Sequence, residues 1–150
     1  MRNLVNFCHW YRTYYSLKDT SVVSSYASYG FDCCMMEMYP ALTTGSAVCI
    51  VPEDIRLNLF EVNEYLKKNK VSHTFMTTQV GRQFATEVSG KKINYLTVAG
   101  ETLVPVAPPE GFELHNGYGP TETTILSTIK HVDKDTVRVP IGVPLFNTKI

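Results

Sequence analysis

The chain has 150 residues, of which 44% are hydrophobic, so it is long enough to form one compact domain with a real core. Lysine plus arginine number 14, as do aspartate plus glutamate, and this balance excludes the positive field typical of nucleic-acid binding. The apolar run at 47–51 is far shorter than the ~20 residues of a membrane span, and the N-terminus lacks a signal-peptide pattern. We therefore expect a cytoplasmic protein that binds neither nucleic acid nor membrane.

The first half of the chain predicts two helices and two strands. Apolar residues recur at helical spacing over 3–17, whereas β-branched and aromatic residues over 22–30 favour a strand. Residues 33–45 indicate a helix that closes at a glycine, with a bend or interruption at Pro40. The continuous apolar run at 47–52 predicts a strand that is buried on both faces.

The middle of the chain alternates between the same two patterns. A helix is predicted over 57–70, a strand over 71–77, a helix over 78–87 and a strand over 93–100. The side of the first helix that we expect to face the core carries Leu57, Phe60, Val62, Tyr65 and Leu66.

The alternation ends after residue 101. Three prolines over 102–113 favour an irregular connection, and 112–119 and 124–132 resemble further strands. The closing segment 137–150 is rich in proline and β-branched residues. Because helices and strands alternate with short loops, we expect an α/β fold in a single unit, with a mostly parallel sheet covered by helices on both faces.

Polar features follow three of the predicted strands. They are Phe31-Asp32, Ala99-Gly100-Glu101 and Gly119-Pro120-Thr121-Glu122. Ligands of open α/β sheets bind where the strands end, so this coincidence predicts a site at one edge of the sheet.

Two of these features have both a structural and a chemical interpretation. The segment 119–122 is typical of a tight turn with a solvated glutamate, although Thr121 could bond a phosphate oxygen and Glu122 could hold Mg²⁺. Asp32 precedes a predicted helix, where N-capping is the common role, although a buried carboxylate could also pair with an ammonium group. From the chemistry alone, the turn and the cap are favoured. Tyr118 offers a flat face for a purine ring.

Other common catalytic patterns are missing from the sequence. There is no GxxxxGK[ST] loop, no GxSxG elbow and no complete GxGxxG fingerprint. The histidines show no metal-ligand spacing, and no CxxC pair occurs among Cys8, Cys33, Cys34 and Cys49. We expect reduced cysteines that pack as small hydrophobic side chains, with a further role only at Cys33.

Three segments resemble core motifs of the adenylation domains of nonribosomal peptide synthetases, within the adenylate-forming superfamily that includes acyl-CoA synthetases and luciferase. NGYGPTETT (116–124) is similar to the fifth core motif almost letter for letter. YGFDCCMMEMYPALTTGS (29–46) is similar to the fourth, and VPIGVP (139–144) to the link after the fifth. Their order and spacing also match, so the resemblance covers essentially the whole chain.

The resemblance implies a reaction and a nucleotide site. An amino-acid carboxylate attacks the α-phosphate of ATP and releases pyrophosphate, and the acyl group then passes to the phosphopantetheine thiol of a carrier protein. By resemblance, Glu122 is the Mg²⁺ ligand and Thr121 a phosphate contact, both catalytic, and Tyr118 stacks on adenine. The nucleotide-binding residues implied in this way are Gly100, Glu101, Asn116, Tyr118, Gly119 and Thr121.

The resemblance also implies an amino-acid pocket. Asp32 has the family's position for the α-ammonium partner, where relatives that activate aryl acids carry asparagine, so an amino acid is favoured as substrate. The side-chain wall would consist of Cys33, Met36, Phe75, Thr97, Ala99, Gly117, Ile125 and Leu126. Because this wall has no charge, we expect a neutral, mostly apolar amino acid. The assignment of Phe75 rests on an ungapped alignment through 71–79.

Parts of the family pattern lie outside these 150 residues. They are the phosphate loop, the motif whose aspartate binds ribose, and the C-terminal domain with its catalytic lysine. We therefore expect a partial adenylation domain over 1–150 that is inactive alone, in a parent that works with carrier protein and condensation domains. An acyl-CoA synthetase-like enzyme, a D-alanine–carrier protein ligase and a non-catalytic interaction module stay open as alternatives.

Overall fold

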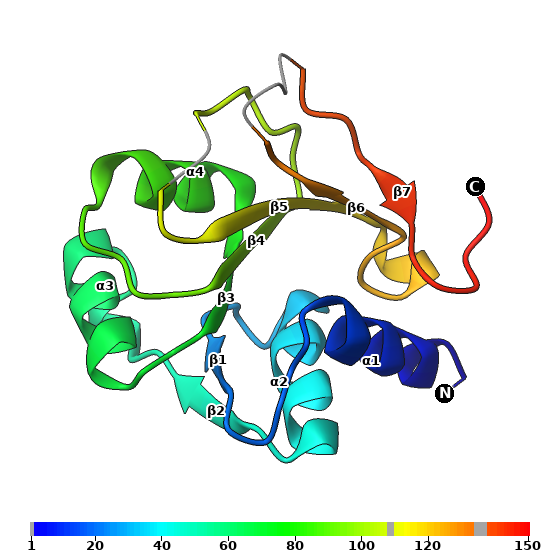
Figure 1. Cartoon of the computed structure of the whole chain (residues 1–150), viewed down its shortest axis with the longest axis horizontal. Helices are drawn as coiled ribbons and strands as arrows, with labels where there is room; N and C mark the ends of the chain where they lie inside the picture. The colour runs from blue at the N-terminus through cyan, green and yellow to red at the C-terminus, as the bar shows by residue number, and fades with distance from the viewer. Residues whose placement is uncertain (1, 108–109, 134–137) are drawn as a thin grey trace.

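The computed structural model describes residues 2–107, 110–133 and 138–150, which form a seven-stranded sheet with helices on both faces (Figure 1). The strand order is β2-β1-β3-β4-β5-β6-β7, parallel from β2 through β5 and antiparallel at β6 and β7. The strands are β1 (Val22–Ser25), β2 (Ala47–Ile50), β3 (His73–Thr77), β4 (Tyr95–Ala99), β5 (Glu113–Tyr118), β6 (Thr128–His131) and β7 (Val143–Pro144). The predicted α/β class with a mostly parallel sheet is confirmed.

The helices form two layers, one on each side of the sheet. Helices α1 (Arg2–Tyr14) and α2 (Cys33–Thr44) cover one face, and α3 (Leu59–Lys68) and α4 (Thr78–Glu87) cover the other (Figure 1). Two short 3₁₀ turns, η1 (Glu53–Ile55) and η2 (Thr121–Thr123), lie in the connections.

The two faces of the sheet bury separate apolar clusters, because successive strand residues point to opposite sides. Phe75 and Ala99 join the cluster beneath α1 and α2. Met76 and Val98, each one residue away along its strand, join the cluster beneath α3 and α4. We call the first of these clusters the α1/α2 core.

Two predictions about burial are wrong. Strand β2 lies at the edge of the sheet, and its residues are exposed or half-buried rather than buried on both faces. Helix α3 begins at Leu59, because the side chain of Asn58 accepts hydrogen bonds from the N–H groups of Phe60 and Glu61. Leu57 therefore lies outside the helix and is 98% exposed, and Phe60 is 62% exposed.

Several element boundaries also differ from the predicted ones. Helix α2 runs through Pro40 without interruption and ends at Thr44. The predicted closing glycine, Gly45, is its C-cap and has a left-handed φ of 82°. Strand β1 ends at Ser25, and β6 begins at Thr128, so both are shorter than predicted. Residues 102–107 are irregular as predicted, while 108–109 lie outside the described residues.

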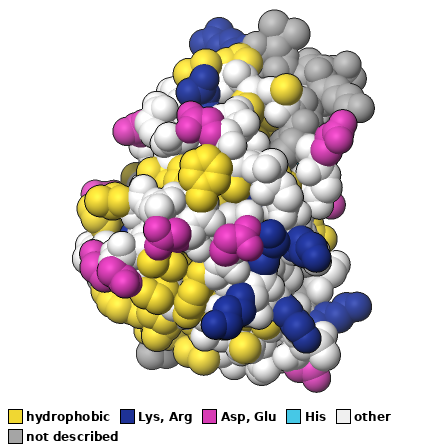
Figure 2. All heavy atoms as spheres, turned by 90° about the vertical axis from the view of Figure 1, so that its left-hand side faces the viewer, with side chains coloured by type: hydrophobic (Ala, Val, Ile, Leu, Met, Phe, Trp, Pro, Cys, Tyr) yellow, Lys and Arg dark blue, Asp and Glu magenta, His cyan; other side chains and the backbone are white. Residues whose placement is uncertain are grey.

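The charges on the surface and the state of the cysteines agree with what the sequence predicted. On the face that Figure 2 presents, acidic and basic side chains both occur among apolar ones. All four cysteines are free thiols. In the described part of the chain, no helix combines the length and the apolar character that a membrane crossing requires.

Candidate functional site

A pocket of about 450 Å³ lies at the carboxyl ends of β4 and β5, where the strand-end features predicted a site. Five of the six predicted nucleotide-binding residues line it, and Thr121 does not. The lining consists of Gly100, Glu101, Thr102, Leu103, Asn116, Gly117, Tyr118, Gly119, Pro120, Val139 and Ile141. The loop after β4 and the end of β5 therefore bring residues from distant parts of the sequence to one cavity.

Asn116 lines this pocket and has one side-chain atom without a hydrogen-bond partner among the described residues. Its side chain is 4% exposed, and its Nδ2 donates to the carbonyl oxygen of Pro140 at 3.1 Å. Its Oδ1 is buried and accepts no hydrogen bond from the described residues. Buried acceptors in proteins are normally paired, so Oδ1 is suited to accept from a ligand N–H such as the amino group of a purine. Tyr118, 49% exposed, lines the same pocket.

The turn after β5 is built on a close approach that only glycine allows. A Cβ on Gly119 would lie 2.5 Å from Cα of Leu126 and 2.7 Å from the carbonyl oxygen of Ile125. The N–H of Ser127 also donates to the carbonyl oxygen of Tyr118 at 2.7 Å. Thr124 and Ile125 have positive φ values of 73° and 71°, a conformation that costs free energy for β-branched residues. The chain therefore folds back tightly between Gly119 and Ser127, and the η2 turn lies within this fold-back.

Thr121 and Glu122 lie on the η2 turn, and both are exposed. Glu122 does not line the pocket at β4 and β5. It lines a separate hollow of about 500 Å³ that also contains Arg2, Asn6 and Lys149. The described residues contain no group of three or more histidine, cysteine, aspartate or glutamate side chains that could hold a metal ion. A single exposed carboxylate nevertheless suits Mg²⁺, which uses one or two carboxylates together with phosphate oxygens and water.

Asp32 lies in the loop between β1 and α2, at the N-cap position of α2. The capping interpretation that the residues alone favoured is wrong, because the side chain makes no capping hydrogen bond and the backbone is helical, with φ −64° and ψ −18°. The Oδ1 atom accepts a hydrogen bond from the Cys33 thiol at 3.8 Å. Oδ2 is buried and accepts none from the described residues. A cationic N–H group is the partner that such an oxygen lacks.

The eight predicted wall residues are brought together beneath α1 and α2. Six of them belong to the α1/α2 core or pack against it, namely Cys33, Met36, Phe75, Ala99, Ile125 and Leu126. The other two adjoin it, because Thr97 pairs with Phe75 in the β3–β4 register and Gly117 lies against the Leu126 side chain. Burial, followed by the charges of Asp32 and Glu37, raises the pKa of the Cys33 thiol to about 12. The Cys33 side chain is therefore a neutral thiol and not a nucleophilic thiolate.

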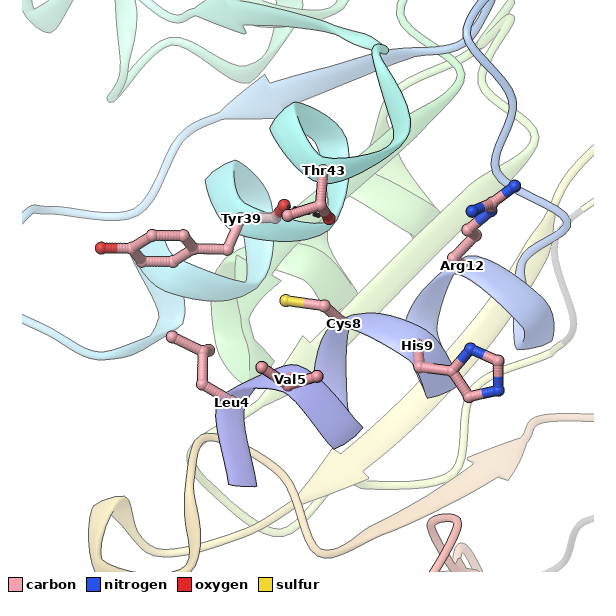
Figure 3. A pocket seen from close by; sticks show the side chains of 7 residues that line it. All are labelled: Leu4, Val5, Cys8, His9, Arg12, Tyr39 and Thr43. Carbon is pink, nitrogen blue, oxygen red and sulfur yellow. Dashed lines mark hydrogen bonds between the residues drawn. The ribbon is translucent and has the colours of Figure 1, made fainter. Parts of the chain in front are cut away.

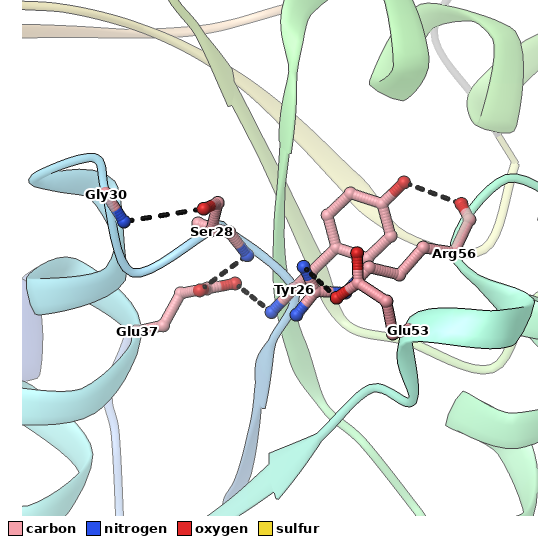
Figure 4. Close-up of polar contacts among 7 residues, drawn as sticks. Tyr26, Ser28, Gly30, Glu37, Glu53 and Arg56 are labelled. Carbon is pink, nitrogen blue, oxygen red and sulfur yellow. Dashed lines mark hydrogen bonds and ion pairs between the residues drawn. The ribbon is translucent and has the colours of Figure 1, made fainter.

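Two buried residues that contact this region were not identified from the sequence. The Tyr15 hydroxyl lies 2.7 Å from Oγ1 of Thr97. The Glu37 carboxylate accepts hydrogen bonds from the N–H groups of Tyr26 and Ala27, at 2.8 and 2.9 Å (Figure 4). A glutamate within the apolar run CCMMEMY was a usable signal for Glu37, because a buried carboxylate needs partners. No local pattern distinguishes Tyr15, directly after α1, from Tyr11 and Tyr14 within it.

A further groove on the molecule lies apart from these residues. It measures about 310 Å³ and lies between α1 and α2, with the side chain of Cys8 directed toward α2 (Figure 3). Its lining contains none of the predicted site residues. The candidate site is therefore the carboxyl edge of the sheet, from the loop after β1 to the turn after β5.

Fold and site together define an α/β protein with a ligand pocket at the ends of parallel strands. A family model described as AMP-binding enzyme matches residues 1–150, and the chain belongs to this family. It is 33% identical over 147 residues to surfactin synthase subunit 2 of Bacillus subtilis, and 30% identical over 149 residues to bacitracin synthase 1 of Bacillus licheniformis. These matches cover 98% and 99% of the chain but only 4% and 3% of the two relatives.

Solved structures agree on the fold. An adenylation domain, AlmE of Vibrio cholerae, solved in complex with glycyl-adenosine-5'-phosphate, matches with a TM-score of 0.79 and 18% identity, over 95% of this chain and 29% of that one. The nonribosomal peptide synthetase FmoA3 matches with a TM-score of 0.81 and 18% identity, over 97% of this chain and 17% of that one. The chain thus spans less than a third of either structure.

Proposed function

We propose that the chain is part of an adenylation domain that activates an amino acid with ATP and Mg²⁺. The carboxylate of the amino acid attacks the α-phosphate, pyrophosphate leaves, and the aminoacyl group then passes to the phosphopantetheine thiol of a carrier protein. The observation that carries this proposal is the buried Oδ2 of Asp32, which lacks a partner among the described residues, while the next residue, Cys33, packs against the α1/α2 core. An α-ammonium group next to an apolar side chain fits that combination of a carboxylate and an apolar wall.

The nucleotide would bind in the pocket at the ends of β4 and β5. Tyr118 would stack on adenine, and Asn116 would accept from its amino group through the unpaired Oδ1. Gly100, Glu101 and Gly119 would form the rest of this wall. Gly119 has no Cβ, so the backbone can lie directly against residues 125–127, just before β6.

The exposed η2 turn would contact the phosphates of ATP, directly and through Mg²⁺. Thr121 would donate its hydroxyl hydrogen to a phosphate oxygen, and Glu122 would hold Mg²⁺. When bound, Mg²⁺ would neutralise phosphate charge that develops as pyrophosphate leaves. Arg2 and Lys149 line the same hollow as Glu122 and add positive charge near it.

The side-chain wall would select a neutral, mostly apolar amino acid. No charged residue occurs among the eight wall positions, and transfer of an unpaired charge into this buried region would cost several kcal/mol. Asp32 would orient the substrate by its ammonium group, so that the carboxylate faces the nucleotide pocket.

The activity would belong to a longer protein. The chain spans only a few per cent of the curated relatives reported above, so the phosphate loop, the C-terminal lysine, the carrier protein and condensation domains are proposed as parts of its wider context. We propose a cytoplasmic location and no activity for the 150 residues alone.

The experiment that tests the proposal is ATP–pyrophosphate exchange with the intact protein that contains this chain, run with each of the common amino acids. We expect exchange with one or a few neutral, mostly apolar amino acids. Exchange with none of them would overturn the amino-acid assignment.

A variant tests the metal site in the same assay. Glu122→Ala should lower the exchange rate by roughly a hundredfold or more, because one electrostatic contact to the reacting phosphates is lost. Glu87→Ala, which removes an exposed carboxylate at the end of α4, is the matched control and should keep the wild-type rate. Unchanged activity of Glu122→Ala would remove the Mg²⁺ assignment while leaving the amino-acid assignment in place.

A further inference from the structure

We infer that Tyr15 forms the inner end of the amino-acid pocket and makes the protein select apolar over hydroxylated side chains. This inference rests on the proposed function, because it assigns a role at the same pocket. It adds a residue of the α1 region to a wall that otherwise comes from α2, the strands and the turn after β5.

The position of Tyr15 is rigidly determined. It directly follows α1, its N–H donates to the carbonyl oxygen of Tyr11 at 3.0 Å, and the residue is 2% exposed. Its ring centroid lies 4.6 Å from that of Tyr11, 4.9 Å from that of Tyr14 and 5.2 Å from that of Tyr95. Rings packed at these distances on several sides leave the Tyr15 side chain little freedom to move.

The Tyr15 hydroxyl engages the one hydroxyl group of the predicted wall. Thr97 is the only serine, threonine or tyrosine among the eight wall positions, and its Oγ1 lies 2.7 Å from the Tyr15 oxygen. Thr97 is 2% exposed, so bulk water does not compete for this hydrogen bond. Burial raises the pKa of the Tyr15 phenol well above its usual value, which keeps the hydroxyl group protonated.

Thr97 is also oriented toward the wall. It lies between Phe75 of β3 and His115 of β5 in the register of the sheet, and two residues before Ala99 on the same face of β4. Because Tyr15 pairs with its hydroxyl group, one of the two hydroxyl hydrogens and one lone pair are already committed, so the wall offers a substrate hydroxyl less hydrogen-bonding capacity than an unpaired Thr97 would. A hydroxylated side chain would then lose its bonds to water without full replacement.

The test compares amino acids that differ by one hydroxyl group. ATP–pyrophosphate exchange with the intact protein is measured for alanine against serine, valine against threonine, and phenylalanine against tyrosine. The measured quantity is the ratio of kcat/KM within each pair, for the wild type, Tyr15→Phe, Thr97→Val and the double variant. Each single variant leaves one buried hydroxyl without its partner, and the double variant leaves none.

We expect each single variant to shift the ratio roughly 2- to 12-fold toward the hydroxylated amino acid in the pair that the wild type uses best, the range of one buried hydrogen bond. The double variant should return to the wild-type ratio, and the KM for ATP should stay constant throughout. Tyr14→Phe is the matched control, since Tyr14 is a neighbouring tyrosine that is 37% exposed, and its ratio should equal that of the wild type.

An unchanged ratio in both single variants, with exchange intact, would overturn the inference. A shift in the double variant as large as in Tyr15→Phe would also overturn it, because the effect would then not depend on the Thr97 hydroxyl. Thr97→Val tests the same hydrogen bond if Tyr15→Phe does not fold. Failure of the proposed function has a different signature, which is a wild-type protein without amino-acid-dependent exchange.

Discussion

The carboxylate of Glu37 accepts a hydrogen bond from the backbone N–H of Ala27 at 2.9 Å. Its second oxygen accepts from the N–H of Tyr26 at 2.8 Å, so one side chain of α2 holds the start of the loop after β1 (Figure 4). That loop ends at Asp32, the proposed partner of the substrate ammonium group. Glu37 is therefore a positioning residue for this side of the site.

Replacement of Glu37 should destabilise the fold. In Glu37→Gln, one carboxylate oxygen becomes an NH₂ group that cannot accept, so one buried N–H loses its partner, at a cost of about 1–3 kcal/mol. Urea unfolding of the 150-residue chain measures this difference. Glu64→Gln, on the exposed surface of α3, is the control and should change the free energy of unfolding by less than about 0.5 kcal/mol.

The loss of stability caused by Glu37→Gln should also depend on pH. Burial raises the pKa of Glu37 to about 8, against the opposing effect of the two N–H groups and Arg56. A carboxyl group with a raised pKa contributes stability that is complete below its unfolded pKa of about 4.5 and is lost as the pH rises through about 8. The difference in the free energy of unfolding between wild type and Glu37→Gln should therefore become smaller from about pH 5 to about pH 8. A difference that stays constant over this range would contradict this account.

Acid should destabilise the fold through two buried histidines. Burial lowers the pKa of His73 to about 4, and burial together with the nearby His131 lowers that of His115 to about 3. A group with a lowered pKa contributes stability above its unfolded value of 6.5 that is lost as the pH falls toward the folded value.

The expected result is a fall in the free energy of unfolding between pH 6.5 and pH 4.5. Each imidazole contributes up to about 1.4 kcal/mol per pH unit, and together they outweigh the opposite trend of Glu37 in this window. Urea unfolding at several pH values measures the slope. His115→Gln should reduce the slope, and a free energy that does not change over this range would exclude the mechanism.

The close turn after β5 should not tolerate a side chain at position 119. In Gly119→Ala, the new Cβ would lie 2.5 Å from Cα of Leu126, and backbone atoms cannot move aside cheaply. We expect a loss of about 3 kcal/mol in unfolding experiments, together with weaker nucleotide binding in the intact protein. Gly30→Ala is the control, since its Cβ would meet only Oγ of Ser28 at 3.8 Å, and wild-type-like stability of Gly119→Ala would refute the predicted clash.

Asp32→Asn should weaken binding of the amino acid without weakening binding of the nucleotide. The amide keeps the shape of the carboxylate but removes its charge, so the substrate ammonium group loses about 3 kcal/mol of stabilisation. We expect the KM for the amino acid to rise roughly a hundredfold in exchange assays, while the KM for ATP stays constant. An equal rise in both constants would mean that Asp32 acts on the fold and not on the substrate.

Much of the fold followed from local patterns. The order of helices and strands was predicted correctly from residue 2 to strand β6, because helical and strand periodicities are properties of neighbouring residues. Burial was predicted less well. Leu57 and strand β2 look like core in the sequence but are exposed or half-exposed, since a helix cap at Asn58 and an edge position in the sheet decided their surroundings.

For the candidate site, too, some features were predicted from the sequence and others were not. The strand-end features at 99–101 and 119–122 were predicted to lie at one edge of the sheet, because parallel strands end at the same edge. Gly100, Glu101, Gly119 and Pro120 do line one pocket, whereas Glu122 lines a separate hollow. The role of Asp32 was not predicted from its chemistry. Its position before a helix is typical of a cap, and only the folded backbone leaves its carboxylate without that hydrogen bond.

The sequence alone determined the α/β class, the order of its elements and the motifs of an adenylate-forming family. Tertiary structure alone decided which buried polar groups have partners. Tyr15 and Thr97 are 82 positions apart, and their hydrogen bond depends on how α1 packs on the sheet. The open acceptors of Asp32 and Asn116 likewise depend on all surrounding elements. Periodicity is local and can be read along the chain, whereas hydrogen-bond satisfaction is a property of the packed whole.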